Sequence, residues 1–122
     1  MAEKISASRL KTIRVVRTGR DHFDVTLFIS ELQLTGIVNG ENWEAIVDAA
    51  QLYSLMSFID GLMLNKTTVV PGKPPRGQTK FVLTYQDGHF ITLGMNLNEA
   101  GLEYYEMEPS EYQDIMELWS SL

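Results

Sequence analysis

Alternating apolar and polar residues over His22–Ser30 form the clearest structural pattern in this chain. Every second residue from Phe23 to Ile29 is apolar, which is typical of a strand with one buried face. The preceding stretch, Leu10–Thr18, is rich in Ile, Val and Thr and leads into a turn at Thr18–Asp21. These two segments therefore predict an antiparallel hairpin.

Further strands are expected along the chain. Asp87-Gly88 is a strong hairpin signal, because this pair tolerates the positive φ angles of a tight turn. We expect it to join two neighbouring strands. Asn39-Gly40 is predicted to be another turn. The expected strands beyond the first hairpin are Leu32–Val38, Leu62–Val70, Thr79–Tyr85, His89–Met95 and a short one at Glu103–Met107.

A long helix is predicted to begin at Asn42, a good N-cap residue, and to end before Gly61. Its apolar residues form two stripes on roughly opposite sides. The first stripe is Trp43, Ile46, Val47 and Ala50, and the second is Leu52, Leu55, Met56, Ile59 and Leu62. Two interpretations remain open: burial on both sides or a break near Gln51, or an interface with further copies of the chain.

A second helix is predicted from Pro109, with Tyr112, Ile115, Met116 and Trp119 on one apolar stripe. The order of elements predicts an α+β fold, with a mainly antiparallel sheet of about five to six strands and two helices packed on it. We expect one domain over residues 1–122. Three prolines and two glycines between residues 71 and 78 predict a flexible loop there.

Charge is sorted along the 122-residue chain, whose net charge is −6. Cations are confined to residues 1–20 and 66–80, whereas residues 21–65 and 81–122 carry carboxylates and no lysine or arginine. This balance argues against general binding to nucleic acid, which needs several cations along the phosphates. We expect no membrane segment, no cofactor and, without cysteine or a signal peptide, a cytoplasmic location.

The basic residues suggest a first candidate site, for a small phosphorylated, nucleotide-like ligand. Arginine forks suit phosphate, and an exposed ring would stack on a base. An alternative is that the cations protect an edge strand from aggregation. The candidate ligand-binding residues are Arg14, Arg17, Arg20, Phe28, Lys73 and Arg76.

The acidic residues suggest a second candidate site, a docking surface for a protein partner with tyrosine anchors. The alternative is a solvated helix face. Combined with the second stripe of the long helix, the candidate interface residues are Leu52, Leu55, Met56, Ile59, Tyr104, Tyr105, Glu108 and Glu111.

His22 and His89 both adjoin predicted turns with aspartates, and they are weak candidates for a metal or acid–base site. No known catalytic motif is present, so we assign no catalytic residue. The sequence favours a non-enzymatic, self-associating interaction module, such as an inhibitor or accessory protein of bacterial or phage origin. The alternatives are a binder that sequesters a small anionic ligand, and an enzyme built on the two histidines.

Overall fold

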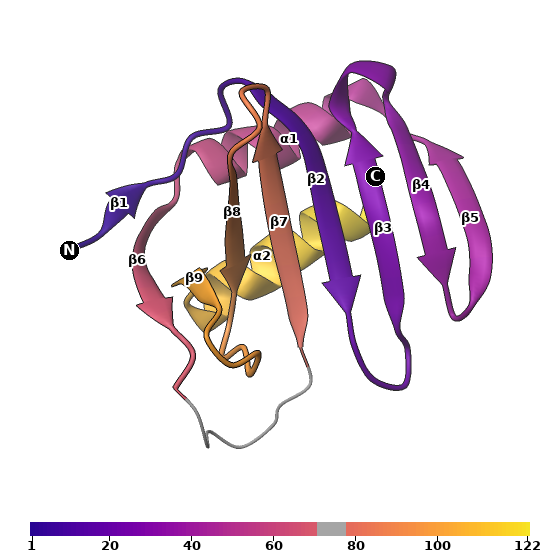
Figure 1. Cartoon of the computed structure of the whole chain (residues 1–122). Coiled ribbons are helices and arrows are strands. Elements are labelled where there is room, and N and C mark those ends of the chain that lie inside the picture. The colour runs from indigo at the N-terminus through magenta and orange to yellow at the C-terminus, as the bar shows by residue number, and fades with distance from the viewer. Residues whose placement is uncertain (71–77) are drawn as a thin grey trace.

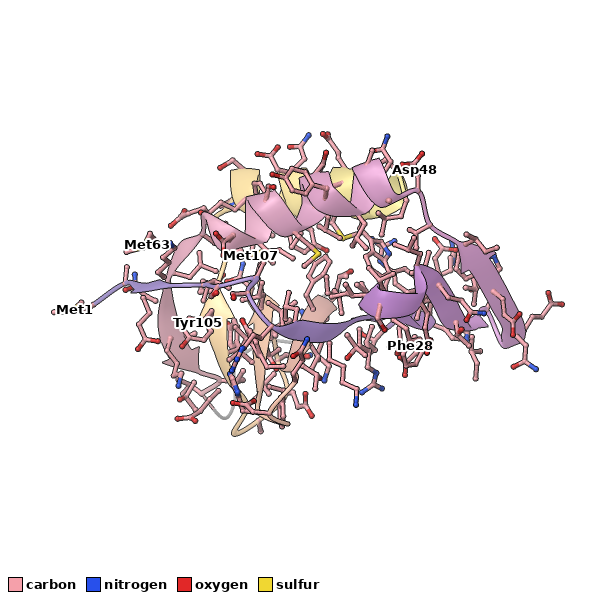
Figure 2. The ribbon with its side chains drawn as sticks, turned by 90° about the horizontal axis from the view of Figure 1, so that it is seen from above. Met1, Phe28, Asp48, Met63, Tyr105 and Met107 are labelled. Atoms are coloured by element: carbon pink, nitrogen blue, oxygen red, sulfur yellow. The ribbon has the colours of Figure 1, made fainter. Side chains whose placement is uncertain are left out.

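The structure, a computed structural model, describes residues 1–70 and 78–122. It is an α+β fold in which two helices, α1 (Ala49–Asp60) and α2 (Pro109–Ser120), cover one face of a nine-stranded sheet (Figure 1). Seen from above, both helices lie on the same side of the sheet (Figure 2). The opposite side is called the open face below.

The sheet has the strand order β1-β6-β9-β8-β7-β2-β3-β4-β5. All neighbours are antiparallel except β8 and β9, which are parallel. The prediction of a mainly antiparallel sheet with two helices is confirmed, but the predicted number of strands was too low. The strands are β1 (Glu3–Lys4), β2 (Leu10–Arg17), β3 (Phe23–Phe28), β4 (Gln33–Val38), β5 (Glu41–Ile46), β6 (Met63–Thr68), β7 (Thr79–Tyr85), β8 (Phe90–Gly94) and β9 (Glu103–Glu106), and a 3-10 turn covers Ile29–Glu31.

The core lies between the sheet and the helices. Alternate residues of the central strands point toward the helices and are buried, as the sequence pattern predicts for strands with one covered face. The helices contribute their own apolar stripes to the same core. Fully buried side chains of this core include Ile13, Val15, Leu27, Phe81 and Leu83 from the sheet and Leu55, Ile59 and Ile115 from the helices.

The prediction that the long helix begins at Asn42 was wrong. Asn39 and Gly40 both have positive φ angles, 49° and 84°, and they link β4 directly to β5 as a two-residue hairpin turn. The helix begins only after Asp48, whose carboxylate accepts hydrogen bonds from the N–H groups of Ala50 at 2.7 Å and Gln51 at 3.4 Å. The shift between the two apolar stripes therefore marks a change from strand to helix.

The second helix is confirmed at its predicted start, since Pro109 is its first residue. Ile115 is fully buried, and Tyr112, Met116 and Trp119 are half-buried against the core. No helix in residues 1–70 or 78–122 is both long and apolar enough to cross a lipid bilayer. The predicted flexible loop falls on residues 71–77, which lie outside the described residues, and on Gln78, which is buried.

Candidate functional site

The edge strand β5 exposes unpaired backbone. Within the part of the chain that the structure describes, β4 is the only strand that pairs with it, through six consecutive one-to-one pairs (Figure 1). The Val47 N–H donates to the Leu32 carbonyl oxygen at 2.8 Å just beyond these pairs. Along an edge strand of an antiparallel pair, residues whose N–H and C=O groups point toward the neighbouring strand alternate with residues whose groups point away from it. The N–H and C=O groups of Asn42, Glu44 and Ile46 point away from β4.

The surroundings of β5 are acidic. Strands β3, β4 and β5 are consecutive in the sheet, and the segment that contains them, residues 21–65, carries no lysine or arginine. The first part of this cation-free block, residues 21–48, thus forms one end of the molecule. Its carboxylates are Asp21, Asp24, Glu31, Glu41, Glu44 and Asp48, whereas Asp60 lies at the far end of α1, where it accepts a hydrogen bond from the Ala7 N–H.

Exposed apolar side chains lie among these acids. Ile46 is 87% exposed although it is a large aliphatic residue in a strand, and Ile37 on the neighbouring strand is 48% exposed. Register places both on the open face, since Ile37 pairs with Asn42 and Ile46 pairs with Gln33. Exposed apolar groups beside unpaired backbone are typical of a surface that binds another chain.

On the helix side, β5 borders an aromatic groove of about 380 Å³. Trp43, 41% exposed, forms part of the wall on β5, and Trp119 and Leu122 form the wall at the C-terminal end of α2. The guanidinium of Arg17 stacks over the Phe23 ring at 5.4 Å within the same groove. The groove is therefore mainly apolar, with one cation at its side.

The opposite edge of the sheet is built differently. It ends in β1, which has only two residues and includes Lys4. Very short edge strands and edge lysines both discourage the addition of another strand. By contrast, β5 has six residues and, like its whole segment, no lysine, arginine or proline. The molecule protects one edge and leaves the other available.

The arginines predicted to bind a phosphorylated ligand do not converge. Arg14 lies on the open face, where its Nε and Nη2 donate to the Asp24 carboxylate at 2.8 and 2.5 Å. Those hydrogen bonds hold the pKa of Asp24 below its usual value. Arg17 lies on the helix side and donates to the Thr79 hydroxyl at 3.0 Å. Arg20 is exposed in the turn between β2 and β3.

Phe28 is half-buried at the far end of β3 from that turn, on the side away from the helices (Figure 2). Lys73 and Arg76 lie outside the described residues. The alternative interpretation, that the basic strand is a protected edge, was wrong because β2 lies in the sheet interior between β7 and β3.

The second apolar stripe of the first helix lies in the core of the chain itself. Leu52, Leu55 and Ile59 are 4%, 0% and 0% exposed, and Met56 is half-buried against the same core. The stripe therefore needs no second copy of the chain to cover it, and these side chains offer little surface to a partner.

The predicted tyrosine anchors are also buried. The hydroxyl of Tyr104 donates to the Glu106 carboxylate at 2.6 Å, and burial followed by this bond raises the pKa of Tyr104 to about 12. The hydroxyl of Tyr105 donates to the Glu3 carboxylate. Glu108 is the N-cap of α2 and Glu111 lies in its first turn, where the Glu108 N–H donates to the Glu111 carboxylate at 2.9 Å. Both glutamates thus have a local role at the start of the helix.

The two histidines lie at opposite ends of the sheet. His89 adjoins the Tyr85 end of β7, whereas His22 adjoins the Arg17 end of β2, and antiparallel register pairs Arg17 with Thr79 at the far end of β7. A shared site is therefore excluded by topology. Within the described residues, no group of three or more potential metal ligands comes together.

No family model matches this sequence, and neither a curated protein nor a solved structure was found that matches it. The β5 edge was not predicted from the sequence, although the Asn39-Gly40 pair was the signal that indicated a hairpin there.

Proposed function

We propose that this protein is a non-enzymatic interaction module that binds an extended, positively charged segment of a partner protein along β5. The observation that carries the proposal is the unpaired outer edge of β5. An extended segment added there would complete the hydrogen bonds of Asn42, Glu44 and Ile46, as in other cases of strand addition.

Charge favours a basic partner. Glu44 lies in the middle of the edge, and no cation of its own segment offsets it or the neighbouring Glu41. A lysine or arginine on the added strand would lie directly across from Glu44, and cross-strand pairs of opposite charge stabilise a sheet. Complementary charge would also speed the encounter of the two proteins.

A second copy of this chain is a poorer occupant of the same edge. Two β5 strands paired antiparallel along their whole length, about a centre at Glu44, would place the two Glu44 side chains opposite each other. Like charges in that position are destabilising. The same edge is therefore better suited to a heterologous partner than to self-association.

Side-chain specificity would come from both faces of the sheet. Alternate residues of the added strand would lie on the open face beside Ile46 and on the helix side beside Trp43. The groove behind Trp43 offers an aromatic surface to one large apolar side chain. We therefore expect the recognised segment to alternate cations with apolar residues.

The test uses a blocked synthetic peptide that alternates lysine and valine, with a glutamate–valine peptide as control. Backbone amides are followed by nuclear magnetic resonance and hydrogen exchange. We expect the lysine peptide to shift and protect the amides of Asn42, Glu44 and Ile46, and the glutamate peptide to leave them unchanged. Shifts that map elsewhere, with β5 unaffected, would overturn the proposal.

Two variants at Glu44 separate the contribution of its backbone N–H group from that of its side-chain charge. Glu44→Pro removes one outward N–H and leaves the ladder to β4 complete, since proline is tolerated on the open side of an edge strand. We expect it to abolish the protection of β5 by the peptide. Glu44→Gln keeps the N–H and should only weaken binding. Undiminished binding by Glu44→Pro, or concentration-dependent protection of β5 without peptide, would contradict the proposal.

A further inference from the structure

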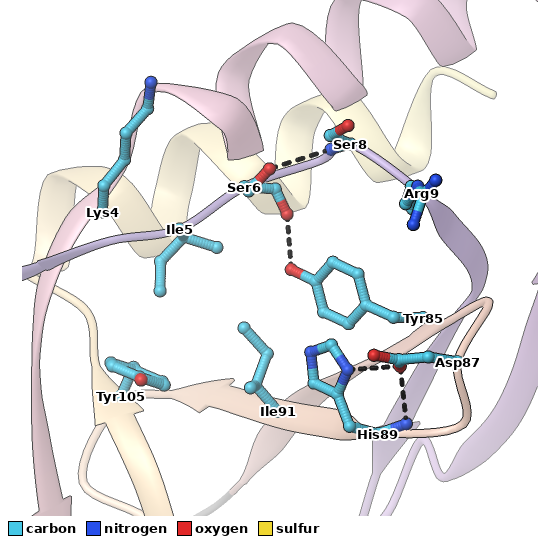
Figure 3. Close-up of a pocket in the computed structure, with 10 residues that line it drawn as sticks. All are labelled: Lys4, Ile5, Ser6, Ser8, Arg9, Tyr85, Asp87, His89, Ile91 and Tyr105. Carbon is cyan, nitrogen blue, oxygen red and sulfur yellow. Dashed lines mark hydrogen bonds and ion pairs between the residues drawn. The ribbon is translucent and has the colours of Figure 1, made fainter.

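A cleft of about 410 Å³ lies between the N-terminal segment and the hairpin that joins β7 to β8 (Figure 3). The cleft lies away from the β5 edge of the sheet, where residues 4–9 run past β7 and β8 (Figure 1). Two hydrogen bonds attach this segment to the last residue of α1 and to the residues that follow it. The Ile5 N–H donates to the Leu62 carbonyl at 2.8 Å, and the Ala7 N–H donates to the Asp60 carboxylate at 2.9 Å.

Two stacked rings form one wall of the cleft. The rings of Tyr85 and His89 lie 4.3 Å apart between centroids, with an angle of 4° between their planes. The Tyr85 hydroxyl donates to the Ser6 carbonyl oxygen, which joins this wall to the N-terminal segment. Tyr85 therefore contacts both His89 of the hairpin and the backbone of the N-terminal segment.

His89 is oriented by its neighbour Asp87. The Asp87 carboxylate contacts Nδ1 of the imidazole and accepts a hydrogen bond from the His89 N–H at 3.0 Å. These bonds to His89 lower the pKa of Asp87, so this carboxylate stays ionised and keeps Nδ1 occupied. The Nε2 edge of the ring is left facing the cleft (Figure 3).

Two basic residues, Lys4 and Arg9, also line the cleft. Arg9 has a φ of 64°, a left-handed conformation that is uncommon for a residue with a side chain. Its carbonyl oxygen accepts a hydrogen bond from the Gln86 N–H at 2.9 Å, which ties this conformation to the hairpin. The Lys4 ammonium points away from the two rings, so Arg9 and the His89 imidazole are the nitrogen-bearing groups left near the hairpin end of the cleft (Figure 3).

We propose that this cleft binds a small organic anion with a flat apolar body. The anionic group would be held by Arg9 and the His89 imidazole (Figure 3). The flat body would lie against the apolar side chains of Ile5 and Ile91. The volume is in the range of small-molecule sites, which combine apolar walls with a few polar groups.

The test compares three probes by nuclear magnetic resonance titration: benzoate, acetate, which lacks the ring, and benzyl alcohol, which lacks the charge. We expect benzoate to shift the resonances of His89 and Tyr85 saturably, at least about tenfold more tightly than either fragment. Equal affinity for acetate would overturn the role of the apolar body. The absence of saturable shifts with millimolar benzoate would overturn the site.

Two variants complete the test. Arg9→Gly removes a cation at a position whose φ favours glycine, so the fold should be kept while benzoate binding weakens about tenfold. His89→Phe keeps an aromatic ring against Tyr85 but removes the ring nitrogens, and it should also weaken benzoate binding about tenfold. Unchanged benzoate binding in either variant would contradict the proposal. Glu44→Pro is the control and should bind benzoate normally.

Discussion

Gly36 lies directly opposite Trp43 in the β4–β5 ladder, where a methyl group on Gly36 would come within 2.2 Å of the Asp24 carbonyl oxygen. The same methyl group would lie 2.6 Å from the Cα atom of Val25. Both atoms belong to the backbone of β3, so only a shift of one strand would relieve the contact. We therefore expect Gly36→Ala to lower the free energy of unfolding by about 1–3 kcal/mol, measured by urea denaturation.

Gly61→Ala is the matched control for that substitution. Gly61 caps α1 with a φ of −94°, and the nearest atom to an added methyl group would be 3.7 Å away. Alanine fits this conformation, so the variant should be neutral or slightly more stable. If both variants had the same stability, close packing at Gly36 would be refuted.

Asp48 is expected to be the residue that determines where α1 begins. Its carboxylate accepts two N–H groups that the helix cannot satisfy itself, so Asp48→Ala should cost about 1 kcal/mol of unfolding free energy. Asn42→Ala is the comparison, because Asn42 has the residue type of a cap but lies in an exposed strand. Thermal unfolding of both variants tests this, and a larger loss for Asn42→Ala would contradict the observed helix start.

This contrast shows why part of the fold escaped prediction. Strands with one buried face, such as β3, show their alternation in the sequence because burial enforces it. Strand β5 has both faces largely exposed, so nothing enforces alternation, and Trp43 and Ile46 happened to match a helical spacing. The Asn39-Gly40 turn makes this segment a strand, because it brings β5 alongside β4 as a hairpin.

The candidate sites were harder to predict than the elements, because they depend on which strands become neighbours. The sequence showed the cation-free segment, but only the order β3-β4-β5 brings its first three strands together at one edge of the sheet. His89 was identified as a candidate, yet its partners in the cleft come from residues 4–9, about eighty positions earlier in the sequence. Tyr104 and Tyr105, read as surface anchors, are buried because β9 is an interior strand.

Leu55 tests whether the second stripe of α1 belongs to the core. Its side chain is fully buried, and Leu55→Ala should therefore lower the free energy of unfolding by about 2–5 kcal/mol. Tyr53 on the same helix is 74% exposed, so Tyr53→Ala should change stability by less than about 0.5 kcal/mol. A Leu55→Ala variant that dissociated an oligomer, as measured by sedimentation, without loss of stability would show instead that the stripe is an interface.

The hydrogen bond from the Tyr105 hydroxyl to Glu3 joins β9 to β1 across β6, and it gives a prediction at high pH. This bond, followed by burial, raises the pKa of Tyr105 from 10.0 to about 12. Because the folded state holds the proton more tightly than the unfolded chain, the resulting stability is fully present below pH 10.0 and is lost as the pH rises toward 12. Glu3→Gln should lower the pKa of Tyr105, measured from its ring resonances, and leave that of Tyr104 near 12. If the pKa of Tyr105 were the same in Glu3→Gln, the carboxylate would not be its partner.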